Sequence, residues 1–194
     1  MVYLHLGHHA DYYPGAEPIH LKVIFRKPDG RLLGAQAVGR ADVARKIDVL
    51  AAFIQMGATA YDLEEAEMAY APQFGSAKDA VNLVGMIAVN ALHGDAPLAP
   101  WEEAMGSEPA LRLDIREPNE VAQGAIPGAV HIPIGKLRES LELLPRDRRI
   151  AVYCHSGKRA HDATRLLRQH GFQAENLSGG YLTYLTLRNN KARS

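Results

Sequence analysis

The sequence predicts an α/β protein in which an α+β domain is followed by a domain built on a parallel sheet. Three patterns support this fold class. The first half alternates apolar and polar residues as a hairpin does and then changes to helical periodicity, whereas the second half repeats strand-then-helix segments. Between them, a stretch containing Gly and two prolines, residues 94–100, interrupts both patterns. We therefore expect domains at 1–94 and 100–194, joined by a linker at 95–99.

The first domain is expected to open on a strand and to continue with a hairpin over residues 19–39. Four apolar residues share one face of the first hairpin strand: Ile19, Leu21, Val23 and Phe25. Asp42 is a candidate N-cap for the helix that follows. A short helical turn at 62–65 and a second helix at 79–93 complete the expected elements of this domain.

The second domain is expected to alternate strands with helices throughout. The strands are expected at 111–115, 129–132, 150–153 and 174–177, and the helices at 118–123, 136–144, 160–170 and 180–188. Such alternation favours a mostly parallel sheet, and ligands of these sheets bind at the carboxyl ends of the strands. Cys154 follows the third strand at such an end. His131 is expected to be a packed, hydrogen-bonded core residue.

The composition indicates a protein with a packed core, since 47% of its 194 residues are hydrophobic and 23% are charged. The formal net charge is zero without the nine histidines, so we expect neither a nucleic-acid nor a membrane partner. No apolar run is long enough for a membrane span, and the start lacks a secretion signal. It enters a strand pattern directly, as a piece cut from a longer chain would.

A single cysteine excludes an internal disulfide and a cysteine-rich metal site, and it fits a reducing compartment. We therefore expect a cytoplasmic protein. We also expect no bound metal, because two adjacent imidazoles, His8 and His9, indicate a metal site only weakly.

Cys154 begins the run Cys-His-Ser-Gly-Lys-Arg, between a predicted strand and a predicted helix. The unpaired N–H groups and positive dipole end of that helix favour thiolate over thiol, and the thiolate is the nucleophile. A lone cysteine is more often a small buried apolar residue. Here the neighbouring Gly157 and the two cations after it favour the nucleophile instead.

The residues that follow Cys154 are candidates for an anion cradle: His155, Ser156, Gly157, Lys158 and Arg159. A tight loop would point their N–H groups inward, and Gly157 adopts a positive φ at little cost. Arg159 would start a helix at its positive end, so it needs an acidic partner or an anionic ligand. Lys158 could be a cation at the mouth of the site or a solvated side chain. His155 could orient a substrate or lie on the surface.

Four segments of the second half, residues 113–120, 124–133, 152–159 and 177–181, carry motifs in the order of one known family. On these segments, residues 100–190 resemble the rhodanese family. The resemblance implies a sulfurtransferase in which the Cys154 thiolate takes a sulfane sulfur and becomes a persulfide. It also implies that Asp114 and Arg116 support the loop. We expect Asp114 to meet Arg159 or a loop N–H, and Tyr181 to pack near the site.

A cysteine phosphatase of the related small-sheet kind is an alternative interpretation. Phosphatases of this kind use a longer loop, whereas only four residues separate Cys154 from Arg159. A smaller ring of N–H groups suits one sulfur atom better than a phosphate. A non-catalytic binding domain is a further alternative, but such domains commonly lose the cysteine.

Four segments of the first half, residues 9–16, 32–39, 46–51 and 69–82, carry a second resemblance. They resemble the C-terminal dimerisation domain of flavin-dependent pyridine nucleotide-disulfide reductases, closest to the coenzyme A-disulfide reductase and NADH oxidase branch. The resemblance implies a homodimer through residues 1–94. It also implies that Tyr12 or Tyr13, together with Tyr70, reaches the disulfide site of the partner subunit, as a hydrogen-bond donor or as interface packing.

The family's cofactor-binding motif is missing, because no Gly-x-Gly-x-x-Gly loop follows a strand. We expect no cofactor in this chain, whereas FAD, NAD(P)H and coenzyme A are implied for a full-length parent. The sequence is thus interpreted as the C-terminal portion of a coenzyme A-disulfide or persulfide reductase. Its own activity would be sulfur transfer from thiosulfate, polysulfide or a coenzyme A persulfide. The alternative is a dimerisation and assembly module whose rhodanese domain is non-catalytic or regulatory.

Overall fold

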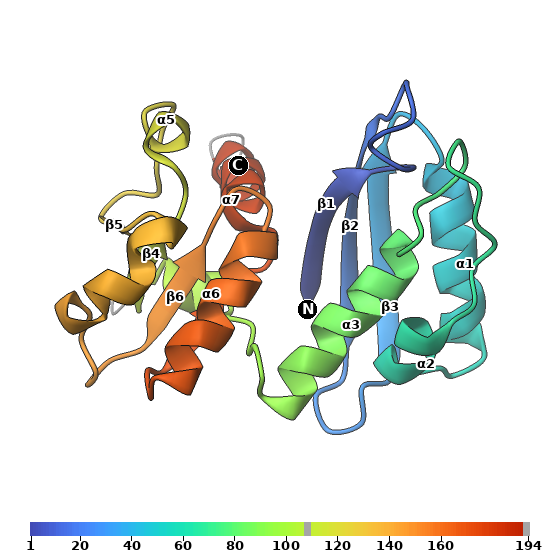
Figure 1. The fold of residues 1–194 in the computed structure, drawn as a ribbon. Coiled ribbons are helices and arrows are strands. Elements are labelled where there is room, and N and C mark those ends of the chain that lie inside the picture. The colour runs from blue at the N-terminus through green and yellow to red at the C-terminus, as the bar shows by residue number, and fades with distance from the viewer. Residues whose placement is uncertain (107–109, 192–194) are drawn as a thin grey trace. The chain divides into compact units, whose positions relative to one another are not determined.

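The chain forms two compact units, Met1–Gly94 and Asp95–Ser194, each with its own sheet and core (Figure 1). The structure is a computed structural model that describes residues 1–106 and 110–191. Residues 97–99, which were expected to be linker, pair with the last strand of the second unit. Asn176 of that strand donates its backbone N–H to the Pro97 carbonyl at 2.7 Å, and its carbonyl accepts from the Ala99 N–H at 3.0 Å.

The first unit is built on an antiparallel sheet of order β1-β2-β3. Its strands are β1 (Val2–Gly7), β2 (Pro18–Phe25) and β3 (Leu32–Gly39). The predicted hairpin face is confirmed, because Ile19, Leu21 and Val23 are all buried. Alternation of side chains along β2 gives the sheet one apolar face, which needs a cover.

Three helices supply that cover (Figure 1): α1 (Val43–Gln55), α2 (Ala60–Glu65) and α3 (Ala80–His93). Asp79 caps α3, since its carboxylate accepts the Val81 N–H at 3.0 Å. Asp42 is the N-cap residue of α1, as predicted, but it has a φ of 59° and its side chain makes no cap bond. Its carboxylate is taken instead by the Arg45 guanidinium, at 2.6 and 2.7 Å.

The second unit is built on a parallel sheet of order β5-β4-β6-β7. Its strands are β4 (Leu111–Asp114), β5 (Val130–His131), β6 (Ile150–Tyr153) and β7 (Ala174–Asn176). Its helices are α4 (Trp101–Ala104), α5 (Pro118–Val121), the 3-10 helix η1 (Ile134–Leu143), α6 (Lys158–Gln169) and α7 (Gly180–Lys191). Every residue of β6 is buried, so the Cys loop leaves the centre of the sheet.

Two expectations for this unit need correction. The segment after β5 is a 3-10 helix, and α4 was not predicted. His131 is exposed rather than a core residue, because β5 is a two-residue strand at the edge of the sheet and both of its residues are exposed. The ring is nevertheless hydrogen-bonded, with Nε2 donating to the Arg116 carbonyl at 2.8 Å.

None of the helices in the described part of the chain is both long and apolar enough to cross a membrane. Across residues 1–106 and 110–191, no three or more His, Cys, Asp or Glu side chains gather as a metal site would require.

Candidate active site

Cys154 lies directly after β6 and is 1% exposed. The Gly157 N–H donates to its Sγ at 3.2 Å. Gly157 is the N-cap of α6 and has a φ of 100°, which a residue with a Cβ rarely adopts. The loop therefore turns back on itself within three residues and aims a backbone dipole at the sulfur.

Further N–H groups of this loop are free to bind an anion. In the part of the chain that the structure describes, no protein acceptor engages the backbone N–H of His155, Ser156, Lys158 or Arg159. The last two belong to the first turn of α6, where N–H groups have no intrahelical partner. His155 and Lys158 are exposed, and Ser156 and Arg159 are partly buried.

The carbonyl groups of the loop are held by the start of α7. The Tyr181 N–H donates to the Cys154 carbonyl at 2.9 Å, and the Leu182 N–H donates to the His155 carbonyl at 3.1 Å. Gly180 makes this approach feasible, because a Cβ there would lie 2.4 Å from the Cys154 carbonyl oxygen. With its carbonyls bound on this side, the loop leaves N–H groups for a ligand.

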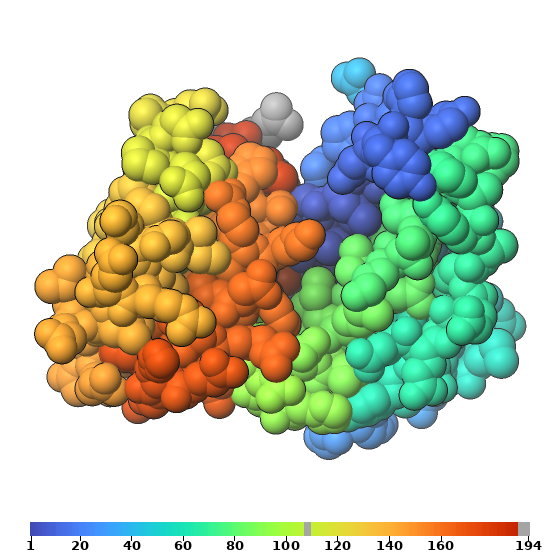
Figure 2. Space-filling model, viewed as in Figure 1, coloured from blue at the N-terminus to red at the C-terminus, as the bar shows by residue number. Residues whose placement is uncertain are grey.

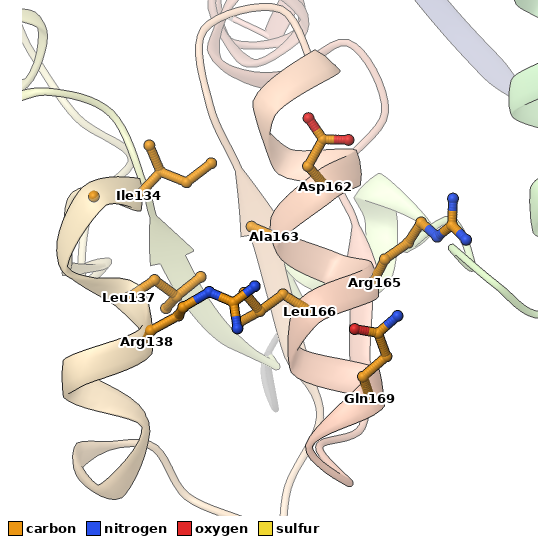
Figure 3. Close-up of a pocket in the computed structure, with 9 residues that line it drawn as sticks. Ile134, Leu137, Arg138, Asp162, Ala163, Arg165, Leu166 and Gln169 are labelled. Carbon is orange, nitrogen blue, oxygen red and sulfur yellow. The ribbon is translucent and has the colours of Figure 1, made fainter.

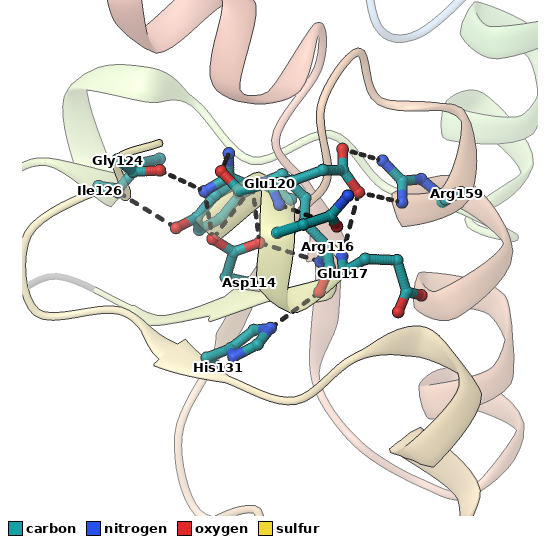
Figure 4. A network of polar contacts seen from close by, with 10 residues as sticks. Asp114, Arg116, Glu117, Glu120, Gly124, Ile126, His131 and Arg159 are labelled. Carbon is teal, nitrogen blue, oxygen red and sulfur yellow. Dashed lines mark hydrogen bonds and ion pairs between the residues drawn. The ribbon is translucent and has the colours of Figure 1, made fainter. Parts of the chain in front are cut away.

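Arg159 has the acidic partner that its position demands, and this partner is Glu120 of α5 (Figure 4). The two form a bidentate ion pair with both N–O distances at 2.7 Å. The Arg159 guanidinium holds the pKa of the Glu120 carboxyl down at about 2. Glu120 in turn raises the pKa of Arg159, and so does the nearby Cys154. The guanidinium thus stays charged beside the sulfur.

The expectation that Asp114 meets Arg159 or a loop N–H is wrong. Asp114 pairs instead with Arg116, both 1% exposed, through Nη2–Oδ2 at 2.6 Å and further bonds from Nε and the backbone N–H (Figure 4). These donors engage both oxygens of the Asp114 carboxylate. Arg116 also donates to the carbonyls of Glu120 and Gly124, at 3.4 and 2.8 Å, and lies over the Tyr181 ring. The predicted pair therefore supports the loop indirectly, by fixing the segment that presents Glu120.

Comparison with known proteins agrees with both halves of this arrangement. Residues 99–186 match the rhodanese-like domain, and residues 5–81 match the pyridine nucleotide-disulphide oxidoreductase dimerisation domain. The chain joins a pyridine nucleotide-disulphide oxidoreductase dimerisation domain to a rhodanese-like domain. The dimerisation domain is the first unit of the fold, and the rhodanese-like domain lies in the second.

Several known proteins are similar to most of this chain or to part of it. A reduced CoADR-RHD from Bacillus anthracis superposes with a TM-score of 0.87 at 40% identity, covering 93% of this chain and 33% of that one. A NAD-dependent persulfide reductase from A. fulgidus gives 0.80 at 37% identity, covering 92% and 33%. A coenzyme A disulfide reductase of Staphylococcus epidermidis is 46% identical over 85 residues, which are 44% of this chain and 19% of the relative. The chain thus spans about a fifth to a third of these relatives.

In the dimerisation domain, the structure brings two of the three predicted tyrosines together. The hydroxyls of Tyr12 and Tyr70 lie 2.5 Å apart, and this hydrogen bond raises the pKa of Tyr70. Their segments lie side by side on the surface (Figure 2), tied by the bond from the Ala10 N–H to the Gly75 carbonyl. Tyr13 instead stacks edge-on against His9, with ring centroids 5.7 Å apart.

A cavity of about 530 Å³ lies elsewhere in the rhodanese-like domain, between η1 and α6 (Figure 3). Ile134, Leu137 and Leu166 line it, together with Arg138 and Arg165. None of the predicted site residues contributes to its lining, so it is separate from the Cys loop.

Sequence reasoning missed two residues that contact the loop, Glu120 and Asn176. Glu120 could have been found, because Arg159 required an acid and Glu117-Pro118-Asn119-Glu120 has the spacing of a capping box. Asn176 donates from Nδ2 to the Gly157 carbonyl at 3.3 Å. No local pattern marks an asparagine at the end of a strand for this task.

Proposed function

We propose that the rhodanese-like domain is a sulfurtransferase that works through a persulfide on Cys154. The observation that carries the proposal is the Cys154 sulfur at the N-terminus of α6, with the Gly157 N–H donating to it at 3.2 Å. Hydrogen bonds from backbone N–H groups stabilise a sulfur anion more than a neutral thiol. Free N–H groups around it could receive the charge of an added sulfur atom.

The proposed reaction has two displacements. The Cys154 thiolate attacks the outer sulfur of thiosulfate, a new S–S bond forms, and the old S–S bond breaks as sulfite leaves with the electron pair. Cyanide or an acceptor thiolate then attacks the outer sulfur of the persulfide, and the Cys154 thiolate leaves. Sulfane sulfur moves from donor to acceptor, and the cysteine returns to its starting state without an external oxidant or reductant.

The charges around the loop favour an anionic donor. Lys158 is an exposed cation of the loop, and the Arg159 guanidinium lies close to the sulfur. Thiosulfate, polysulfide and a coenzyme A persulfide all carry negative charge and a sulfane sulfur. Opposite charge steers such a donor towards the loop.

We further propose that this chain is a portion of a longer flavin- and NAD(P)H-dependent coenzyme A-disulfide or persulfide reductase, with a homodimer formed through residues 1–94. The residues described here do not fit flavin or nicotinamide themselves. The turn between β6 and α6 is the Cys loop, and no Gly-x-Gly-x-x-Gly run follows a strand. Tyr12 and Tyr70 would act at the partner's disulfide site, where a phenol can donate a hydrogen bond to a leaving thiolate.

Sulfur transfer to cyanide tests the first proposal, with thiosulfate and polysulfide as donors. We expect turnover in the wild type and only the uncatalysed rate in Cys154→Ser, which keeps the shape but removes the thiol. Alkylating the wild type with iodoacetamide should abolish turnover equally, because the sequence has one cysteine. Turnover that persists in Cys154→Ser would overturn the proposal, and so would a wild type that is inactive with both donors.

A further inference from the structure

Asn176, at the end of β7, is fixed on three sides beside the Cys loop. It is 3% exposed, and its backbone N–H and carbonyl are both bonded to the segment 97–99. Its side chain bonds to the Cys loop instead, with Nδ2 donating to the Gly157 carbonyl at 3.3 Å. Its Oδ1 has no hydrogen-bond partner in the described part of the chain. Asn176 therefore anchors the loop from a strand that contains none of the predicted site residues.

The bonded carbonyl belongs to the peptide unit that joins Gly157 to Lys158. A trans peptide is planar, so the Lys158 N–H points opposite to the Gly157 carbonyl. That carbonyl faces into α6, where it also accepts the His161 N–H at 3.0 Å. The Lys158 N–H consequently faces the end of the helix where Sγ accepts the Gly157 N–H.

Gly157 needs an external restraint, because glycine has more backbone freedom than any other residue. The Asn176 amide supplies one by holding the carbonyl side of Gly157, while the Gly157 N–H is held by the sulfur. A carboxylate at this position would lose the donor and place a negative charge against a carbonyl oxygen. Of these two side chains of similar size, only the amide can donate a hydrogen bond to the Gly157 carbonyl.

We infer that Asn176 is a positioning residue that holds the N–H groups of Gly157 and Lys158 towards the Cys154 sulfur. The inference rests on the proposed sulfurtransferase function. Asn176 touches neither the sulfur donor nor the acceptor and acts only through the peptide between Gly157 and Lys158. Donors that are already oriented stabilise a developing anion without reorganisation, so their misalignment slows the step that forms it.

Asn176→Asp and Asn176→Ala test the inference against Thr164→Val. Thr164 is a matched control, since it is fully buried in the same unit and its hydroxyl has no partner among the described residues. Two experiments are made: steady-state kinetics, which give kcat and KM for thiosulfate and cyanide, and the rate at which iodoacetamide alkylates Cys154 as a function of pH. Thermal unfolding establishes that each variant is folded.

Both Asn176 variants should lower kcat about tenfold, the effect of one lost hydrogen bond, with KM for thiosulfate little changed. Alkylation should slow by a similar factor at neutral pH but not in strong alkali, where the thiol is ionised without help. Thr164→Val should match the wild type in both. The alanine variant, which adds no charge, keeps the test open if the aspartate variant does not fold.

An alkylation profile and a kcat that match the wild type in a folded Asn176 variant would overturn the inference. A wild type without turnover would instead overturn the proposed function. The alkylation profile would still decide whether Asn176 orients the loop.

Discussion

Glu120 joins two parts of the site at the level of single side chains. Its Oε2 accepts the Glu117 N–H at 3.0 Å at the start of α5, and both its oxygens bind Arg159 at the start of α6. Its backbone carbonyl is in turn held by Arg116. One residue therefore connects the buried Asp114–Arg116 pair, through its backbone carbonyl, to the start of α6, through its carboxylate.

Glu120→Gln should destabilise the rhodanese-like domain by about 1 kcal/mol at neutral pH, because it breaks a bidentate charge-assisted pair that solvent partly screens. The pKa of Glu120 is lowered in the folded state to about 2 from an ordinary 4.5. Its contribution is therefore complete above about pH 4.5 and is lost as the pH falls towards 2. Urea unfolding of both proteins across this range measures the difference.

Glu139→Gln is the matched control, because Glu139 pairs with Lys136 at 3.5 Å on the open surface, with both side chains at least 70% exposed. Its effect should stay within about 0.5 kcal/mol at every pH. A Glu120→Gln difference that does not shrink in acid would show that the ion pair is not its source.

At the level of elements, the Cys loop packs directly against the start of α7, backbone against backbone. The start of α7 binds two loop carbonyls, and Gly180 lies between them with a φ of 56°. A Cβ on Gly180 would approach the Cys154 carbonyl oxygen to 2.4 Å and the His155 carbonyl oxygen to 2.9 Å. Backbone atoms cannot move aside as a flexible side chain can.

Gly180→Ala should therefore destabilise the rhodanese-like domain by at least about 2 kcal/mol, through left-handed strain together with the clash. The free energy of unfolding in urea checks this. Gly135→Ala in η1 is the control, because a Cβ there meets nothing within 4 Å and the φ is not positive. Equal stabilities of the two variants would contradict the close packing of α7 on the loop.

Strand and helix order could be predicted from the sequence, because it depends on local periodicity and turns. The alternation in β2 and the strand, cysteine and helix run at β6 are examples. Partners between elements were harder to predict. No local sequence pattern shows that Asp114 pairs with Arg116, two residues along the chain. Nor does one show that Arg159 pairs with Glu120 of a different helix. His131 was misplaced because burial depends on whether its strand is at the edge of the sheet.

At the level of the whole molecule, the chain combines two units with separate cores. The dimerisation domain is expected to make the full chain a homodimer at micromolar concentration. Light scattering should give twice the monomer mass for the full chain and for residues 1–94, and the monomer mass for residues 95–194. A monomeric full chain would contradict the proposal, and a dimer of residues 95–194 would place the interface in the other unit.

The central claim is that Cys154 carries the transferred sulfur. Intact-protein mass spectrometry after brief exposure to thiosulfate tests it most directly, since the sequence has no other cysteine to share the label. We predict a gain of one sulfur atom that cyanide removes and that Cys154→Ser does not show. A wild type that gains no sulfur, or a gain that survives in Cys154→Ser, would contradict the claim.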